Sequence, residues 1–340
     1  MPGRGKSGLS LVELLVAIGL LAMLIVMAGA VFRIAVQTTR IARANAEILQ
    51  RLRVITLQLD ADLGGLYKHG EVFIAYVARK EPNAVGNYAR MDRMMFFSTG
   101  TFRSTGPGGS SAINGQVARV GYFLSRRAGG SGTLIRFRHI LTAEPSLGPV
   151  LDPNTATDPR PWQDWARDPQ HQYDRMTIQQ WAQMPYASKR AAIIGMMGVD
   201  IESGLVDHQF GPHVDPADPC SRELVLSDLV SHFQVQAWSD RLNRWVPDID
   251  PDGNGALSDS DLLVSGGVLE EDKAAFVLWS SGAANKVSFG PGLAGLKDPG
   301  TQFLDVPGLG RAFKFTITIH DSKGLIKGGR TFTYVVYFGS

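Results

Sequence analysis

The stretch that decides the fold is residues 1–32, MPGRGKSGLSLVELLVAIGLLAMLIVMAGAVF. A short basic leader ends at Gly8, and nineteen residues without a charge run from Leu14 to Phe32. A helix of that length is about 28 Å long, close to the ~30 Å hydrocarbon core of a bilayer. Because the cations precede the apolar run, the pattern predicts a single membrane crossing with the leader on the cytoplasmic side.

Glu13 separates the possible kinds of N-terminal segment. A carboxylate just inside an apolar helix costs roughly 3 kcal/mol at bilayer depth unless it is paired. A plain anchor has no use for such a charge. The same holds for a cleavable signal peptide, whose small-residue cleavage site would be Ala28-Gly29-Ala30. The charge therefore indicates a segment with a function beyond anchoring.

The run Gly8-Leu9-Ser10-Leu11-Val12-Glu13 resembles the N-terminus of the type IV prepilin family, which includes the type II secretion pseudopilins. The resemblance covers about the first thirty residues. It implies that a prepilin peptidase cuts after Gly8 and methylates the new N-terminus at Leu9. It also implies that Glu13, then the fifth residue, pairs with the N-terminal amine of a neighbouring subunit during filament assembly. The family usually begins with phenylalanine, and Leu9 departs from that.

Composition excludes several classes of function. The chain has 340 residues, and Lys+Arg 34 against Asp+Glu 32 leaves a formal charge of +2, so no general nucleic-acid affinity is expected. A single cysteine, Cys220, excludes an intrachain disulfide. No serine-hydrolase elbow, zinc-protease motif or P-loop occurs, and we therefore expect no enzyme.

The helix is expected to continue beyond the membrane. Residues 33–63 contain neither proline nor glycine, and Gly64-Gly65 supplies a stop. One apolar stripe follows the helical period; it comprises Ile41, Ile48, Leu52, Ile55, Leu59 and Leu63. The pattern predicts one helix from Leu9 to Leu63, with 9–32 in membrane or filament core and 33–63 packed on a sheet. An anchor followed by a separate core helix is the alternative.

Residues 66–340 are expected to form a β-rich periplasmic body, which makes the fold class α+β and pilin-like. Alternating or β-branched runs predict strands at 71–78, 93–99, 116–125, 133–139, 223–229 and 230–238. Residues 311–320 and 330–338 are predicted to form a closing hairpin, with its last strand central in the sheet. Glycine-rich residues 100–115 predict a flexible loop.

Residues 144–220 are rich in proline and aspartate and are interpreted as an irregular insertion over one end of the sheet. Short helices are expected at 177–184 and 188–197. Tryptophans in the insertion, Trp181 among them, argue against full disorder because they need a surface to pack on. Its histidines match no metal-binding template. The order of strands around the insertion is loosely similar to J-type minor pseudopilins and W-type minor pilins.

Residues 250–261, DPDGNGALSDSD, follow the spacing of a calcium-binding loop. Alternate residues of a tight loop converge on one point, and Gly255 permits the sharp turn. The expected oxygen ligands are Asp250, Asp252, Asn254, Ala256 through its carbonyl, Ser258 and Asp261. A solvated acidic turn is the alternative.

The sequence as a whole predicts a minor pilin or pseudopilin of the bacterial inner membrane, with its body in the periplasm. Its expected partners are prepilin peptidase, the membrane and other pilins that contact its N-terminal helix. The alternatives are a filament-tip module for adhesion or DNA uptake and a membrane-anchored periplasmic hydrolase. The sequence does not distinguish a secretion machine from a pilus machine.

Overall fold

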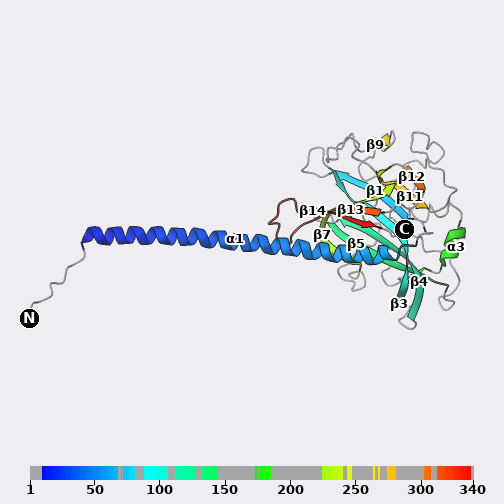
Figure 1. The fold of residues 1–340 in the computed structure, drawn as a ribbon, viewed down its shortest axis with the longest axis horizontal. Helices are drawn as coiled ribbons and strands as arrows, with labels where there is room; N and C mark the ends of the chain where they lie inside the picture. The colour runs from blue at the N-terminus through cyan, green and yellow to red at the C-terminus, as the bar shows by residue number, and fades with distance from the viewer. Residues whose placement is uncertain are drawn as a thin grey trace, which may run out of the picture.

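The computed structural model has a long helical rod that projects from a β-rich body (Figure 1). This arrangement confirms the α+β class. The residues that the structure describes are 10–67, 70, 72–80, 88–105, 112–126, 132–143, 173–174, 176–184, 224–239, 243–246, 263–264, 267–268, 274–280, 302–307 and 312–337.

The rod is a single helix, α1 (Leu11–Gly64), of 54 residues. Its uninterrupted course confirms the prediction of one helix and shows that the alternative, an anchor with a separate core helix, is wrong. The helix ends at the predicted glycine pair, where Gly65 follows as the C-cap. At 1.5 Å per residue the rod is about 80 Å long.

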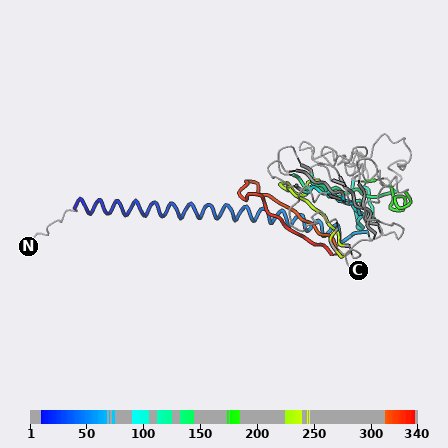
Figure 2. Tube along the Cα trace, turned by 90° about the horizontal axis from the view of Figure 1, so that it is seen from above, coloured from blue at the N-terminus to red at the C-terminus, as the bar shows by residue number. Residues whose placement is uncertain are grey.

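The first half of α1 makes no contact with the body in either view (Figures 1 and 2). Its large apolar side chains from Leu11 to Ile34 are each 54–77% exposed. Apolar surface of this extent needs a lipid or protein environment. Among the described residues, α1 is the one helix long and apolar enough to cross a membrane, which fits a single-pass anchor.

The second half of α1 packs on the body. Full burial begins at Ala44, and Ile48, Ile55, Leu59 and Leu63 are almost completely buried against β3, β7, β13 and β14. Each such side chain contributes about 1.5–3 kcal/mol when it is removed from water. Leu52 packs against the same core at its margin, whereas Ile41 stays 41% exposed because it lies before the first buried position of the helix. The predicted stripe is thus confirmed from its second member onward.

The body is built on one predominantly antiparallel sheet. In the described part of the chain, twelve strands belong to it, and its main path runs β12-β11-β1-β3-β4-β5-β7-β13-β14. Short strands β2, β6 and β8 pair with β1, β5 and β7, while β9 and β10 pair with each other. The pairs β11–β12 and β5–β6 are parallel. The strands are β1 (Val72–Lys80), β2 (Tyr88–Arg90), β3 (Arg93–Thr105), β4 (Ala112–Arg126), β5 (Gly132–Leu141), β6 (Tyr173–Asp174), β7 (Val225–Ser239), β8 (Arg244–Val246), β9 (Leu263–Val264), β10 (Gly267–Val268), β11 (Ala274–Ser280), β12 (Gln302–Pro307), β13 (Ala312–Ile319) and β14 (Arg330–Tyr337).

Two strand predictions are wrong. The loop predicted at residues 100–115 is largely a continuation of the β3–β4 hairpin, because Phe102 to Thr105 pair with Gly115 to Ala112 across a register shift. The last strand is not central: β14 lies at the end of the strand path, and most of its side chains remain at least partly exposed. Strands β11 and β12, which form the other end of the strand path, were not predicted.

The buried face of β7 lies within the strand predicted at 230–238. Val230, Phe233, Val235 and Ala237 are all fully buried. The two predicted strands at 223–229 and 230–238 form one element, which bends at Leu229. That residue has a φ of 60°, and its carbonyl accepts a hydrogen bond from His320 N at 2.8 Å beside a register shift with β13. A bulge of this kind lets one long strand follow the curved sheet.

Candidate functional site

The candidate site is α1 itself, and its first turn contains Glu13. Ser10 is the N-cap: its side chain accepts a hydrogen bond from Val12 N at 3.3 Å. The carboxylate of Glu13 returns the interaction, since Oε2 accepts from Ser10 N at 3.0 Å. The two residues form a capping box, which satisfies backbone donors that the first turn would otherwise leave unpaired.

The capping box was missed in the sequence interpretation, although the pattern Ser-x-x-Glu in residues 10–13 is its signature. It gives Glu13 a role inside its own chain. An acidic group in the first turn also interacts favourably with the positive end of the helix dipole. Any function of this carboxylate between subunits therefore has to be separated from its function as a cap. Gly8 and Leu9, the predicted processing residues, lie outside the described residues.

The far end of α1 is fixed to the sheet by Asp62. This carboxylate is buried, and Arg136 of β5 donates to both of its oxygens, from Nε to Oδ2 and from Nη2 to Oδ1, each at 2.6 Å. The hydroxyl of Tyr122 on β4 donates to the same Oδ2, and Gln58 Nε2 donates to Oδ1 at 3.1 Å. A bidentate arginine pair with further donors satisfies a buried carboxylate well.

The Asp62 cluster changes the ionisation of its partners. Burial and the charge of Asp62 together raise the pKa of Tyr122 well above its ordinary value, which keeps the phenol protonated as a donor. Burial disfavours the charged form of Arg136 and by itself would lower its pKa. The hydrogen bonds and negative charge of Asp62 have the larger effect and raise the pKa of the guanidinium. The sequence contains one signal for this cluster: Asp62 falls between Leu59 and Leu63, on the apolar stripe.

A second set of polar contacts holds the middle of α1. Glu47 Oε1 accepts from Arg51 Nη2 at 3.0 Å, and its carboxylate also accepts from the backbone amide and hydroxyl of Ser322 at 3.2 and 3.0 Å. Arg51 reaches across to the carboxylate of Asp228 in β7. Near the end of the helix, Tyr334 of β14 donates to Asp60 Oδ2 at 2.5 Å. These contacts fix the angle at which the rod leaves the body.

The described part of the predicted insertion is attached to the sheet. The predicted helix is present as α3 (Ile178–Gln183), and its Trp181 is buried against the ring of Phe97 at 5.4 Å, which confirms that this tryptophan has a packing partner. Asp174 of β6 is buried with Arg119 at 3.1 Å and His139 at 3.2 Å. Burial opposes the charge of Asp174, but Arg119 and His139 outweigh it and lower its pKa.

The remaining site predictions fall outside the described residues. They include the calcium loop at 250–261, the helix predicted at 188–197, Cys220 and the histidines of the insertion. Within the described ranges, no group of three or more His, Cys, Asp or Glu side chains is arranged to hold a metal ion.

Comparisons with known family models, with curated proteins and with solved structures give no match to this chain. The helix, its polar residues and the way it joins the body are therefore the features that bear on function.

Proposed function

We propose that this chain is a filament subunit, processed by prepilin peptidase and assembled through α1 into a pseudopilus or a type IV pilus. The observation that carries the proposal is the division of one continuous helix into two halves. The first half exposes apolar side chains on all sides with Glu13 at its start, and the second half is fixed to the sheet. Such a rod can leave the bilayer and pack beside identical rods without any change in the body.

The charge of Glu13 gives the assembly step a physical basis. After cleavage behind Gly8, the chain would begin with an amine at Leu9, and an α-amino group and a glutamate are both charged at pH 7. Each would be costly in an apolar helix bundle without a partner of opposite charge. An amine from one subunit and Glu13 from its neighbour would neutralise each other there.

The size of the body favours a minor subunit. The body continues for more than 270 residues after α1 and is built on a sheet of twelve described strands. Rods that pack closely leave little room for a body of this width on each subunit. The proposed location is the bacterial inner membrane and then the filament, with the body in the periplasm.

The first experiment concerns processing. Mass spectrometry of the mature protein should find a methylated Leu9 at its N-terminus, and Gly8→Ala should accumulate the uncut chain. An N-terminus near Val31 would mean ordinary signal peptidase and would exclude filament assembly by this helix.

The second experiment separates the charge of Glu13 from its capping function. Glu13→Gln keeps a side chain that can cap the helix but removes the charge, whereas Ser10→Ala weakens the cap and keeps the charge. We expect Glu13→Gln and Glu13→Val to be inserted and cut but to lose co-purification with partner pilins. Ser10→Ala should retain it. If Ser10→Ala lost assembly while Glu13→Gln assembled normally, the charge of Glu13 would not be needed. Glu13 would then act only as part of the helix cap.

A further inference from the structure

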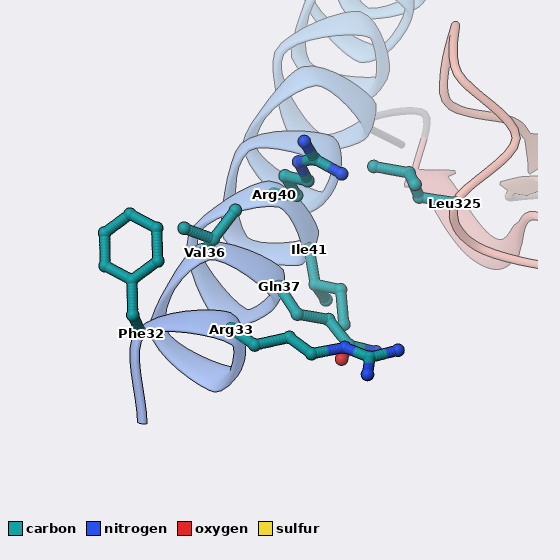
Figure 3. A pocket seen from close by; sticks show the side chains of 7 residues that line it. All are labelled: Phe32, Arg33, Val36, Gln37, Arg40, Ile41 and Leu325. Atoms are coloured by element: carbon teal, nitrogen blue, oxygen red, sulfur yellow. The ribbon is translucent and has the colours of Figure 1, made fainter. Parts of the chain in front are cut away.

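A pocket of about 580 Å³ lies between α1 and the turn that joins β13 to β14 (Figure 3). The helix contributes an apolar part and a polar part to it, and the turn contributes Leu325. The lining residues are Phe32, Arg33, Val36, Gln37, Arg40, Ile41 and Leu325. In Figure 3 the side chain of Leu325 points from the turn toward Arg40 and Ile41.

The pocket is at the level where the membrane surface is expected. Fully apolar sequence ends at Phe32, and the pocket continues to Ile41, a distance of about 14 Å along the helix. The polar headgroup layer on one side of a bilayer is about 5–8 Å thick. If the apolar half of α1 lies in the bilayer, the lower part of this pocket lies among the headgroups.

The charges around the pocket are positive. Arg33 and Arg40 line it, and the turn carries Lys323 and Lys327, all four exposed. Within the described residues none of these four cations has a carboxylate partner. The acidic group of the turn, Asp321, is buried, and its oxygens accept hydrogen bonds from the turn's own backbone amides.

The turn is preformed. The carboxylate of Asp321 accepts hydrogen bonds from the amides of Lys323, Leu325 and Ile326 at 3.2, 2.8 and 2.9 Å. Burial opposes its charge, but these amides outweigh it and lower the pKa of Asp321. Glu47 of α1 holds the adjacent Ser322. Leu325, 41% exposed, is thus presented at a fixed position beside Arg40 of the helix.

We propose that this pocket binds the headgroup of an anionic phospholipid in the leaflet that faces the body. Arg33 and Arg40 would bind the phosphate, and Gln37 would donate to a glycerol or headgroup oxygen. Phe32 and Val36, at the membrane end of the pocket, would contact the start of the acyl chains, and Leu325 would cover the headgroup beside Arg40. Arginine suits this role because its planar fork matches phosphate oxygens and its stem packs on apolar groups. The inference requires α1 to be embedded in a bilayer, but it does not require filament assembly.

The test uses the full chain in lipid nanodiscs, with one chain per disc. One set contains only zwitterionic phosphatidylcholine, and the other contains one quarter phosphatidylglycerol. Hydrogen–deuterium exchange of residues 321–329 is followed by mass spectrometry. We expect exchange in this turn to be at least threefold slower with phosphatidylglycerol, and we expect the difference to shrink in about 0.5 M salt, where the Debye length falls below 5 Å.

Matched variants make the test specific. Arg33→Gln/Arg40→Gln should abolish the lipid effect, while Arg53→Gln/Arg103→Gln removes the same charge from exposed positions away from the pocket and should leave it intact. All four residues are exposed, so both variants should fold, and thermal melts check this.

Three results would overturn the proposal. The first is equal exchange of the turn in both lipid compositions. The second is the same protection in phosphatidylcholine discs on addition of millimolar glycerol phosphate, which would indicate a site for a soluble phosphate. The third is protection that depends on two chains per disc, which would indicate a neighbouring copy of α1 as the occupant.

Discussion

Removing the charge of Asp62 should detach the end of α1 from the sheet. In an Asp62→Asn variant the side chain keeps its size, but Arg136 loses its counter-charge and both of its 2.6 Å hydrogen bonds to a carboxylate. Asparagine has one acceptor oxygen in place of two, so Tyr122, fully buried on β4, competes with Arg136 for it. The substitution thus leaves one buried cation and one buried phenol with weaker partners.

The magnitude follows from burial. Breaking a buried ion pair by removing one partner costs about 3–5 kcal/mol. The side chain of Arg136 is still 20% exposed and recovers some hydration, so a loss of about 2–4 kcal/mol is expected. For a body larger than 250 residues, each kcal/mol of lost stability lowers the melting temperature by about 2 °C. The melting temperature should therefore fall by roughly 4–8 °C.

The assay is thermal unfolding of the detergent-solubilised full chain, with Asp60→Asn as the matched control. Asp60 lies two residues earlier on α1, is exposed, and accepts one hydrogen bond from Tyr334. Its replacement should cost about 1 kcal/mol or less. Equal melting temperatures for the two variants would refute the view that Asp62 fixes the rod to the sheet. A double-mutant cycle with Tyr122→Phe should also show coupling between the two positions.

Three further predictions concern other parts of the body. Trp181→Ala should lower the free energy of unfolding of the body by about 3–5 kcal/mol in denaturant, because a buried indole beside Phe97 is lost. A change under about 1 kcal/mol would contradict this packing. Burial and the hydrogen bond to Asp60 raise the pKa of Tyr334 to about 12 from 10.0. The stability that this protonated phenol contributes is present below pH 10 and should be lost between pH 10 and 12. In thermal melts across this range, the melting temperature of Tyr334→Phe should fall less steeply with pH. If residues 250–261 bind calcium, the melting temperature should be about 2–4 °C higher in millimolar calcium than in chelator. An Asp250→Ala/Asp252→Ala variant that kept this shift would contradict the ligand assignment.

The elements that sequence predicted well have a strong local period. The stripe from Ile48 to Leu63 follows the helical repeat, and the alternation in β7 follows the strand repeat, so each pattern indicates both the element and its buried face. The short helix predicted at 177–184 is present as α3, and Thr177 is its N-cap.

The errors have physical reasons as well. The end of β3 and the start of β4 are rich in glycine, serine and threonine, residues typical of loops, yet cross-strand backbone pairing holds them in a ladder. The apolar, β-branched character of β14 indicated a central strand, whereas its partial burial comes from α1 lying across it. Pairing of Asp62 with Arg136 joins residues 74 positions apart, a separation that no local pattern reports.

The contacts of α1 with β13 and β14 impose an order on folding. Helix α1 precedes every strand, and the β13–β14 hairpin that covers its second half follows all the others, so the two meet only when nearly all of these residues have been synthesised. Until then the stripe from Ile48 to Leu63 has an incomplete surface to pack on. Contacts between such distant segments slow folding, because a long loop must close before any gain is made. If the apolar half of α1 enters a membrane before the last hairpin is made, the unfinished body must complete its folding while it is tethered there.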